Sequence, residues 1–158
     1  MSRKTNAIRL IEQAGVDYEV RSYELSIEDF SAAAVAERIR MDAAAVFKTL
    51  VATGSGNGPC FAIVAGDAEL DMKALARHAG ERKMEMVPVR DLERLTGYRR
   101  GGVTALGARK ALPVFLDRTA MTHATIGVSA GTKGLQVLLA PQDYVTLTAA
   151  SVVELQRR

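Results

Sequence analysis

The strongest strand signal in the chain reads Val46-Phe47-Lys48-Thr49-Leu50-Val51-Ala52, an apolar run with one charged residue near its centre. Side chains alternate between the two faces of a strand, so Val46 and Leu50 share a face with Lys48. The other face carries Phe47, Thr49 and Val51. Because both faces are mostly apolar, we predict a central strand of a sheet.

Lys48 is the unusual residue of this strand. An ammonium group in apolar surroundings costs free energy unless an anion, a carboxylate or water meets it, and the strand itself offers no acidic residue. Two interpretations stand. Lys48 borders a pocket for an anionic ligand, or it lies near the rim of the sheet and its aliphatic stem carries the charge to solvent.

Length and composition predict one soluble domain over residues 1–158. Apolar residues make up 48% of the chain and charged residues 25%, and no apolar run reaches the length of a membrane span. No signal peptide precedes the first predicted helix, so we expect a cytoplasmic protein. The net charge of +3 permits contact with a phosphate backbone but does not require it.

The cysteine and histidine content argues against an intrachain disulfide and against a metal site. Cys60 is the only cysteine, which rules out an intrachain disulfide, and it lies in an apolar segment typical of a core thiol. His78 and His123 belong to no ligand motif. We therefore expect neither a metal site nor a cofactor.

Apolar periodicity and capping residues predict a mixed α+β fold. Helices are predicted from Ser2 or Thr5 to Ala14 and over residues 31–40, 71–79 and 88–96, with a short one from Pro141. Strands are predicted over residues 18–23, 46–52, 60–65, 84–86, 112–116, 124–128, 135–139 and 149–155. Several strands are joined by short hairpins, which favours a mostly antiparallel sheet over a doubly wound parallel one.

A glycine-rich loop covers residues 101–107. Gly102 and Gly107 have the spacing of a phosphate-binding loop, but Ala108-Arg109 replaces the Lys-Ser/Thr that ATP binding needs, so that function is excluded. The loop is either a wide turn or a place where the backbone closely approaches a ligand. Arg99-Arg100 and Arg109-Lys110 flank it.

A second glycine-rich tip, residues 129–134, joins two predicted strands. Its successive N–H groups are suited to an oxyanion or an ester carbonyl. If the apolar residues of both strands share one face, Ser129 and Gln136 lie together on the other. This indicates either a polar site or an ordinary polar hairpin.

Familiar catalytic motifs are absent from the sequence. It contains no Gly-x-Ser-x-Gly elbow, no evident Ser-His-Asp set and no paired carboxylates. Any chemistry must therefore depend on positioning, on a lysine and backbone amides, or on groups of the substrate itself.

The chain resembles the YbaK/EbsC family, the prolyl-tRNA-synthetase-associated editing domains, from about Tyr18 to Tyr144. Each motif is weak alone, but their order is specific. The motifs are Phe47-Lys48-Thr49-Leu50, Gly97-Tyr98, Gly101-Gly102-x-x-x-x-Gly107, Leu112-Pro113 and Val128-Ser129-x-Gly131-x-x-Gly134-Leu135.

The resemblance implies a mixed, barrel-like sheet surrounded by helices and a free-standing enzyme that deacylates mischarged tRNA(Pro), with the Cys-tRNA(Pro) deacylases as the closest branch. Its partners would be the acceptor end of aminoacyl-tRNA and prolyl-tRNA synthetase. Editing of Ala, Ser or Thr, or noncatalytic binding of tRNA or a synthetase, remains an alternative. In the Cys-acting members the substrate thiol attacks its own ester, and other branches use a tRNA hydroxyl or water.

The resemblance also implies the site. Lys48 and Ser129 match catalytic positions, and further positions would bind the substrate. Two departures leave the edited amino acid open: many members have Ser-Pro in place of Thr104-Ala105, and Cys-acting members have Asp in place of Gln136. The implied substrate-binding residues are Tyr23, Phe30, Thr49, Gly101, Gly102, Thr104, Gly131, Gly134 and Gln136.

Overall fold

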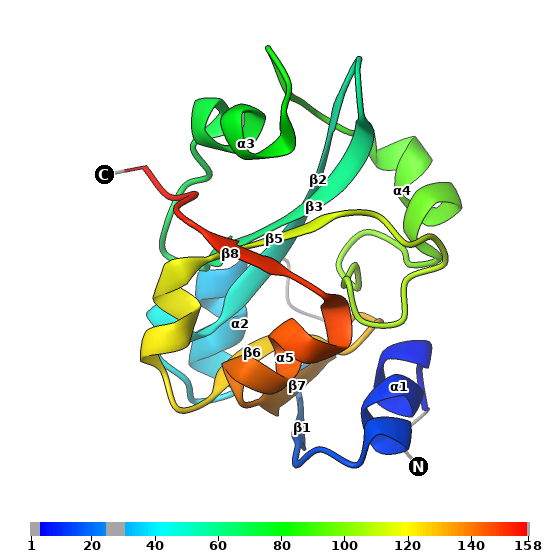
Figure 1. Cartoon of the computed structure of the whole chain (residues 1–158). Helices are drawn as coiled ribbons and strands as arrows, with labels where there is room; N and C mark the ends of the chain where they lie inside the picture. Colours follow the sequence, from blue (N-terminus) through cyan, green and yellow to red (C-terminus); the bar gives the residue numbers. More distant parts are fainter. Residues whose placement is uncertain (1–3, 25–30, 158) are drawn as a thin grey trace.

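The structure, a computed structural model, describes residues 4–24 and 31–157 and confirms the mixed α+β class (Figure 1). Its strands form two sheets. One is antiparallel, in the order β1 (Glu19–Ser22), β7 (Leu135–Leu139), β6 (Ile126–Ser129). The other has the order β4 (Glu85–Met86), β2 (Phe47–Gly54), β3 (Gly58–Ala65), β5 (Val114–Asp117), β8 (Ser151–Val153).

The two sheets meet at the start of β2. Val46 forms a parallel bridge to Gly127 of β6. A Cβ atom at Gly127 would lie 3.1 Å from the sulfur of Met41 and 3.6 Å from a methyl of Val46, so glycine permits this close approach. The largest core cluster, which includes Phe47, Val51 and Val128, fills the space between the sheets.

The predicted alternation along β2 is confirmed. Phe47 and Val51 lie in the core between the sheets, whereas Leu50 and Ala52 lie in a second core cluster with Leu75 of α3. β2 is an inner strand of its sheet, but β4 pairs with only Ala52 and Thr53. The outer edge of β2 before Ala52 therefore has no strand beside it in this sheet, and the pocket described below lies there.

The helices cover the sheets and begin close to their predicted caps. Thr5, Ser31 and Asp71 accept backbone N–H bonds at the starts of the first three, and Gly15 and Gly80 end two of them in the left-handed conformation. They are α1 (Asn6–Ala14), α2 (Ala32–Arg38), α3 (Met72–Ala79), α4 (Val89–Thr96) and α5 (Pro141–Thr148).

Two short 3-10 helices were not predicted, Ala43–Ala45 and Arg118–Thr122. Both are too short to show a helical period, and an aspartate begins each. Asp117 is buried and also accepts hydrogen bonds from the backbone N–H groups of Leu155 and Gln156, at 2.7 and 3.1 Å. The C-terminal segment is held to β5 in this way.

No helix within the described ranges combines the length and the apolar character needed to span a bilayer.

Tyr144 carries a polar atom that the core leaves unsatisfied. The residue is fully buried, and its hydroxyl has no hydrogen-bond partner among the described residues. We expect Tyr144→Phe to raise the free energy of unfolding by about 1 kcal/mol, because it removes an unpaired buried hydroxyl. Urea denaturation measures this. Tyr98→Phe is the matched control and should lower it by about as much, since the Tyr98 hydroxyl donates to the Leu106 carbonyl at 2.7 Å.

Cys60 is predicted to be inert in the folded protein. It is 3% exposed, and burial raises the pKa of its thiol from 9.0 to about 11. We expect no alkylation by iodoacetamide at pH 8 until the chain is unfolded in guanidinium. Because the folded state keeps a proton that the unfolded state releases, this contribution to stability is lost as the pH rises from 9.0 to about 11. Rapid labelling of the folded protein would contradict the assignment.

Candidate active site

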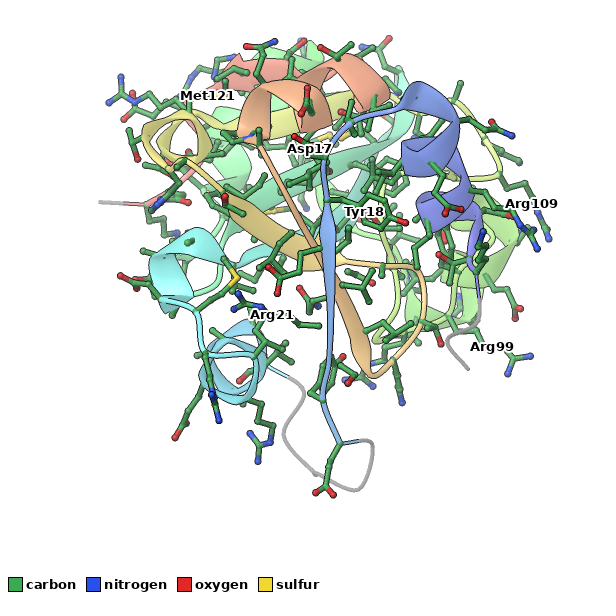
Figure 2. The ribbon with its side chains drawn as sticks, turned by 90° about the horizontal axis from the view of Figure 1, so that it is seen from below. Asp17, Tyr18, Arg21, Arg99, Arg109 and Met121 are labelled. Atoms are coloured by element: carbon green, nitrogen blue, oxygen red, sulfur yellow. The ribbon has the colours of Figure 1, made fainter. Side chains whose placement is uncertain are left out.

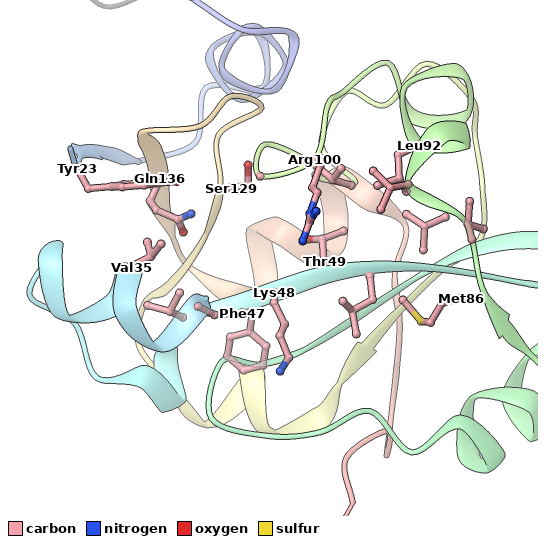
Figure 3. Close-up of a pocket in the computed structure, with 18 residues that line it drawn as sticks. Tyr23, Val35, Phe47, Lys48, Thr49, Met86, Leu92, Arg100, Ser129 and Gln136 are labelled. Atoms are coloured by element: carbon pink, nitrogen blue, oxygen red, sulfur yellow. The ribbon is translucent and has the colours of Figure 1, made fainter. Parts of the chain in front are cut away.

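A pocket of about 480 Å³ lies along β2, between α2 and the segment that carries β4 and α4 (Figure 3). Every residue from 46 to 51 lines it. Consecutive residues point to opposite faces of a strand, so one pocket can touch all of them only along the edge of the strand. The main chain of β2 is therefore part of the wall.

Many of the site residues suggested by the sequence share this pocket. Those in the lining are Tyr23, Lys48, Thr49, Gly101, Ser129 and Gln136. Gly102, Thr104, Gly131 and Gly134 lie outside the lining. Phe30 lies outside the described residues.

Ser129 and Gln136 face each other across the pair β6–β7, in the register that the hairpin predicts. The Ser129 hydroxyl oxygen accepts a hydrogen bond from the Gly131 N–H at 3.2 Å. Since this bond occupies a lone pair, the hydroxyl proton remains available as a donor. Gly134 lies outside the lining but positions Tyr23, which belongs to it. The Gly134 carbonyl accepts a hydrogen bond from the Tyr23 N–H at 2.9 Å.

The two glycine-rich turns pack directly against each other. A Cβ atom at Gly102 would lie 2.7 Å from the Thr132 Cα, and one at Gly101 would lie 2.6 Å from the Lys133 side chain. Gly101 also has a φ of 90°, which side chains rarely adopt. Glycine is therefore required by the contact between the turns. Thr104 supports the loop from inside, where its hydroxyl accepts from the Leu106 N–H at 3.3 Å.

Two buried acceptor atoms in the lining have no partner. Gln136 is only 7% exposed, and neither its Oε1 nor the Oγ1 of Thr49 has a hydrogen bond among the described residues. Burying such an atom unpaired costs about 1–3 kcal/mol. Because both residues line the pocket, a ligand with N–H or O–H groups would satisfy them.

Lys48 lines the pocket, as one of the two interpretations of its strand requires. It is half-buried on the face of β2 opposite Thr49, and Figure 3 shows its amine directed away from Ser129 and Gln136. No carboxylate of the described residues forms a salt bridge with it. Thr49, rather than Lys48, therefore faces the Ser129 hydroxyl, and Lys48 stands at the border of the pocket.

Residues that sequence reasoning did not assign to the site also line the pocket. Arg100 directs its guanidinium group toward Thr49 (Figure 3). Met86 and Val89 also line the pocket, although they are 48% and 56% exposed. Arg100 belongs to a basic pair that was noted beside the loop, but no sequence signal marks exposed apolar residues as parts of a site.

The other basic residues near the loop lie outside the lining. Arg99 forms an ion pair with Glu93 at 3.3 Å on the surface. Figure 2 shows Arg99 and Arg109 at one side of the molecule, and Arg21 apart from them near the middle of the view. Of the loop's flanking cations, Arg100 is the one that reaches the pocket.

The sequence is similar to known proteins over nearly its whole length. Residues 28–147 match the aminoacyl-tRNA editing domain. A protein of Enterococcus faecalis, provisionally named a Cys-tRNA(Pro)/Cys-tRNA(Cys) deacylase, EbsC, is 40% identical over 97% of this chain and 93% of its own length. The uncharacterised protein YwhH of Bacillus subtilis is 27% identical over 74% of each chain.

Solved structures share the fold. A crystal structure provisionally described as a trans-editing enzyme for prolyl tRNA synthetase has a TM-score of 0.87 at 24% identity, over 99% of this chain and all of that one. The hypothetical protein APE2540 has a TM-score of 0.86 at 18% identity, over 97% of this chain and all of its own. The chain belongs to the aminoacyl-tRNA editing domain family, as its five motifs predict.

Proposed function

We propose that the protein is a cytoplasmic trans-editing deacylase that cleaves the ester of mischarged tRNA(Pro), with Cys-tRNA(Pro) as its substrate and prolyl-tRNA synthetase as its partner. Family membership and the 40% identity to the EbsC protein support this. The observation that carries it is one pocket that combines a free hydroxyl donor, Ser129, with the unpartnered acceptors of Thr49 and Gln136.

Ser129 stabilises the transition state in this proposal. As a nucleophile adds to the ester carbonyl, negative charge builds on its oxygen. The Ser129 hydroxyl, held by Gly131, donates to that oxygen. Donors fixed before the reaction stabilise the charge without reorganising.

Gln136 and Thr49 orient the aminoacyl group. An α-ammonium group is a donor only, and the pocket offers it the unpaired Gln136 Oε1 and Thr49 Oγ1. An N–H group bound beside either atom supplies the hydrogen bond that it lacks. The Gln136 amide carries no charge, so recognition depends on hydrogen bonding rather than on an ion pair.

We assign the attacking group to the substrate or to water, since the pocket lining holds no Cys, His, Asp or Glu that could attack the ester or activate the Ser129 hydroxyl. With a cysteinyl ester, the substrate sulfur forms a bond to the carbonyl carbon while the bond from that carbon to the ribose oxygen breaks. The thiol proton ends on the ribose hydroxyl. Water attack follows the same course and releases the free amino acid.

A panel of charged tRNAs tests the function. tRNA(Pro) carrying Cys, Ala, Ser or Thr is incubated with the protein, and release of the amino acid is measured against hydrolysis in buffer. We expect Cys to be released fastest. Faster release of another amino acid would reassign the substrate. Binding without accelerated release of any of them would establish a noncatalytic tRNA-binding module instead.

Lys48→Ala is expected to raise KM several-fold while leaving kcat nearly unchanged. The amine lies at the border of the pocket, where it can meet a phosphate of the tRNA but not the reacting carbonyl. Lys48→Arg, which keeps the charge, should retain most of the affinity. A large loss of kcat in Lys48→Ala would instead place the amine on the reacting groups.

A further inference from the structure

The outer edge of β2 is open where the pocket lies. Val46 is bridged to Gly127, and β4 pairs only with Ala52 and Thr53. Between these points no second strand of the described part forms a ladder with β2 on that side. The edge is about 16 Å long, from five residues at 3.3 Å each. This is room for a nucleoside.

The register shows which main-chain groups point outward. In β3, Phe61 donates its N–H to the Pro113 carbonyl, so its main-chain groups point toward β5. Those of the alternate residues Ala62 and Val64 therefore point toward β2, where they form hydrogen bonds with Leu50 and Lys48. The main-chain groups of Thr49 and Val51 therefore face the open edge. A hydrogen bond confirms this direction for Val51, since its carbonyl accepts from the N–H of Val87, on the outer side of β2, at 2.9 Å. A carbonyl acceptor, Thr49, and an N–H donor, Val51, thus stand two residues apart beside the pocket.

An apolar shelf adjoins this pair. Met86 and Val89 line the pocket, yet they are 48% and 56% exposed, and Leu92 lies beside them in the lining. Large apolar side chains gathered on an exposed surface indicate a contact that covers them. The shelf stands next to Val51, because Val87 bonds to that residue.

We propose that this edge and shelf bind the adenine of the tRNA's 3′-terminal adenosine. Adenine presents an amino donor, N6, beside a ring acceptor, N1, which complement the Thr49 carbonyl and the Val51 N–H. Its apolar face covers Met86 and Val89. The proposal rests on the deacylase function, since that function brings the terminal adenosine into this pocket. Hypoxanthine would not fit this pair, because it has an acceptor, O6, in place of the N6 donor and an N1–H donor in place of the N1 acceptor.

Substrate analogues test the main-chain contacts, which no side-chain substitution removes. Aminoacylated minihelices are prepared with the terminal adenosine replaced by purine riboside, which lacks the N6 amine, or by 1-deazaadenosine, which lacks N1. Each is expected to raise KM about fivefold, as for one lost hydrogen bond, with kcat little changed. The matched control is 7-deazaadenosine, altered on another edge of the ring, which should behave as adenosine does.

A pair of variants tests the shelf. Met86→Ser is expected to raise KM several-fold for the minihelix with adenosine. Met121→Ser is the control, since Met121 is 37% exposed on the 3-10 helix at 118–122 and lies outside the pocket. If both variants have the KM of the wild type, the shelf does not bind the base.

Failure of this inference is distinguishable from failure of the function. If the wild type deacylates all the minihelices alike, the adenine site is wrong and the deacylase stands. If it deacylates none, the proposed function fails. The adenine site can still be tested by NMR, by titrating the 15N-labelled protein with adenosine. The Val51 amide resonance should then shift with adenosine and not with 1-methyladenosine. An unmoved Val51 amide overturns the inference.

Discussion

Replacing Ser129 by alanine is expected to lower kcat by about a hundredfold, the usual effect of removing one donor to a developing oxyanion. KM should change little, because the hydroxyl acts mainly on charge that forms in the transition state. Release of the amino acid from Cys-tRNA(Pro) in single-turnover conditions measures the effect. The Gly131 N–H loses its acceptor in this variant, so a cost of about 1 kcal/mol in folding free energy accompanies it.

Two controls make the Ser129 result decisive. Ser151→Ala removes an exposed hydroxyl on β8, away from the pocket, and should leave kcat unchanged. Ser129→Thr keeps a hydroxyl and should recover part of the rate. If Ser129→Ala retains wild-type kcat, another group stabilises the carbonyl oxygen and the proposed role of the hairpin is wrong.

Gly102→Ala is expected to lower kcat by up to about a hundredfold, since a displacement of about 1 Å at a reacting group has effects of that size. The new methyl would lie 2.7 Å from the Thr132 backbone, so the two turns must move apart. The hairpin tip that carries Ser129 moves with Thr132. The folding free energy should fall by about 1–3 kcal/mol for such overpacking.

Gly15→Ala is the control for Gly102→Ala. Gly15 ends α1 with a φ of 71°, and a Cβ atom there meets nothing within 4 Å. The substitution costs about 1 kcal/mol of stability through its backbone conformation alone. It should leave kcat unchanged. Equal losses of kcat in the two variants would show that lowered stability, rather than movement of the turn, explains the Gly102 result.

Local features of the sequence were sufficient to predict most elements of the fold. The caps Thr5 and Asp71 mark the starts of α1 and α3. Ends were predicted less well. The last strand was expected over 149–155, but only Ser151–Val153 pairs with β5, because pairing depends on the neighbouring strand rather than on local propensity.

The site was predicted in part because strand parity carries spatial information. The hairpin register that puts Ser129 opposite Gln136 follows from counting residues, and the structure has that register. Lys48 shows the limit of this reasoning. Its strand was identified, but the face that it occupies relative to Ser129 depends on how two separate sheets meet at Val46 and Gly127.

The sequence alone determined the family, the α+β class and the identity of the polar residues near the pocket, because these follow from motifs, periodicity and spacing along the chain. The tertiary structure decided which of them share one space: Thr49 with Ser129 and Gln136, and Met86 with the open edge of β2. The physical reason is that burial and the pairing of backbone edges are set by contacts between segments far apart in the chain. The unpaired oxygens of Thr49 and Gln136, and the free main chain beside them, exist only in the folded protein.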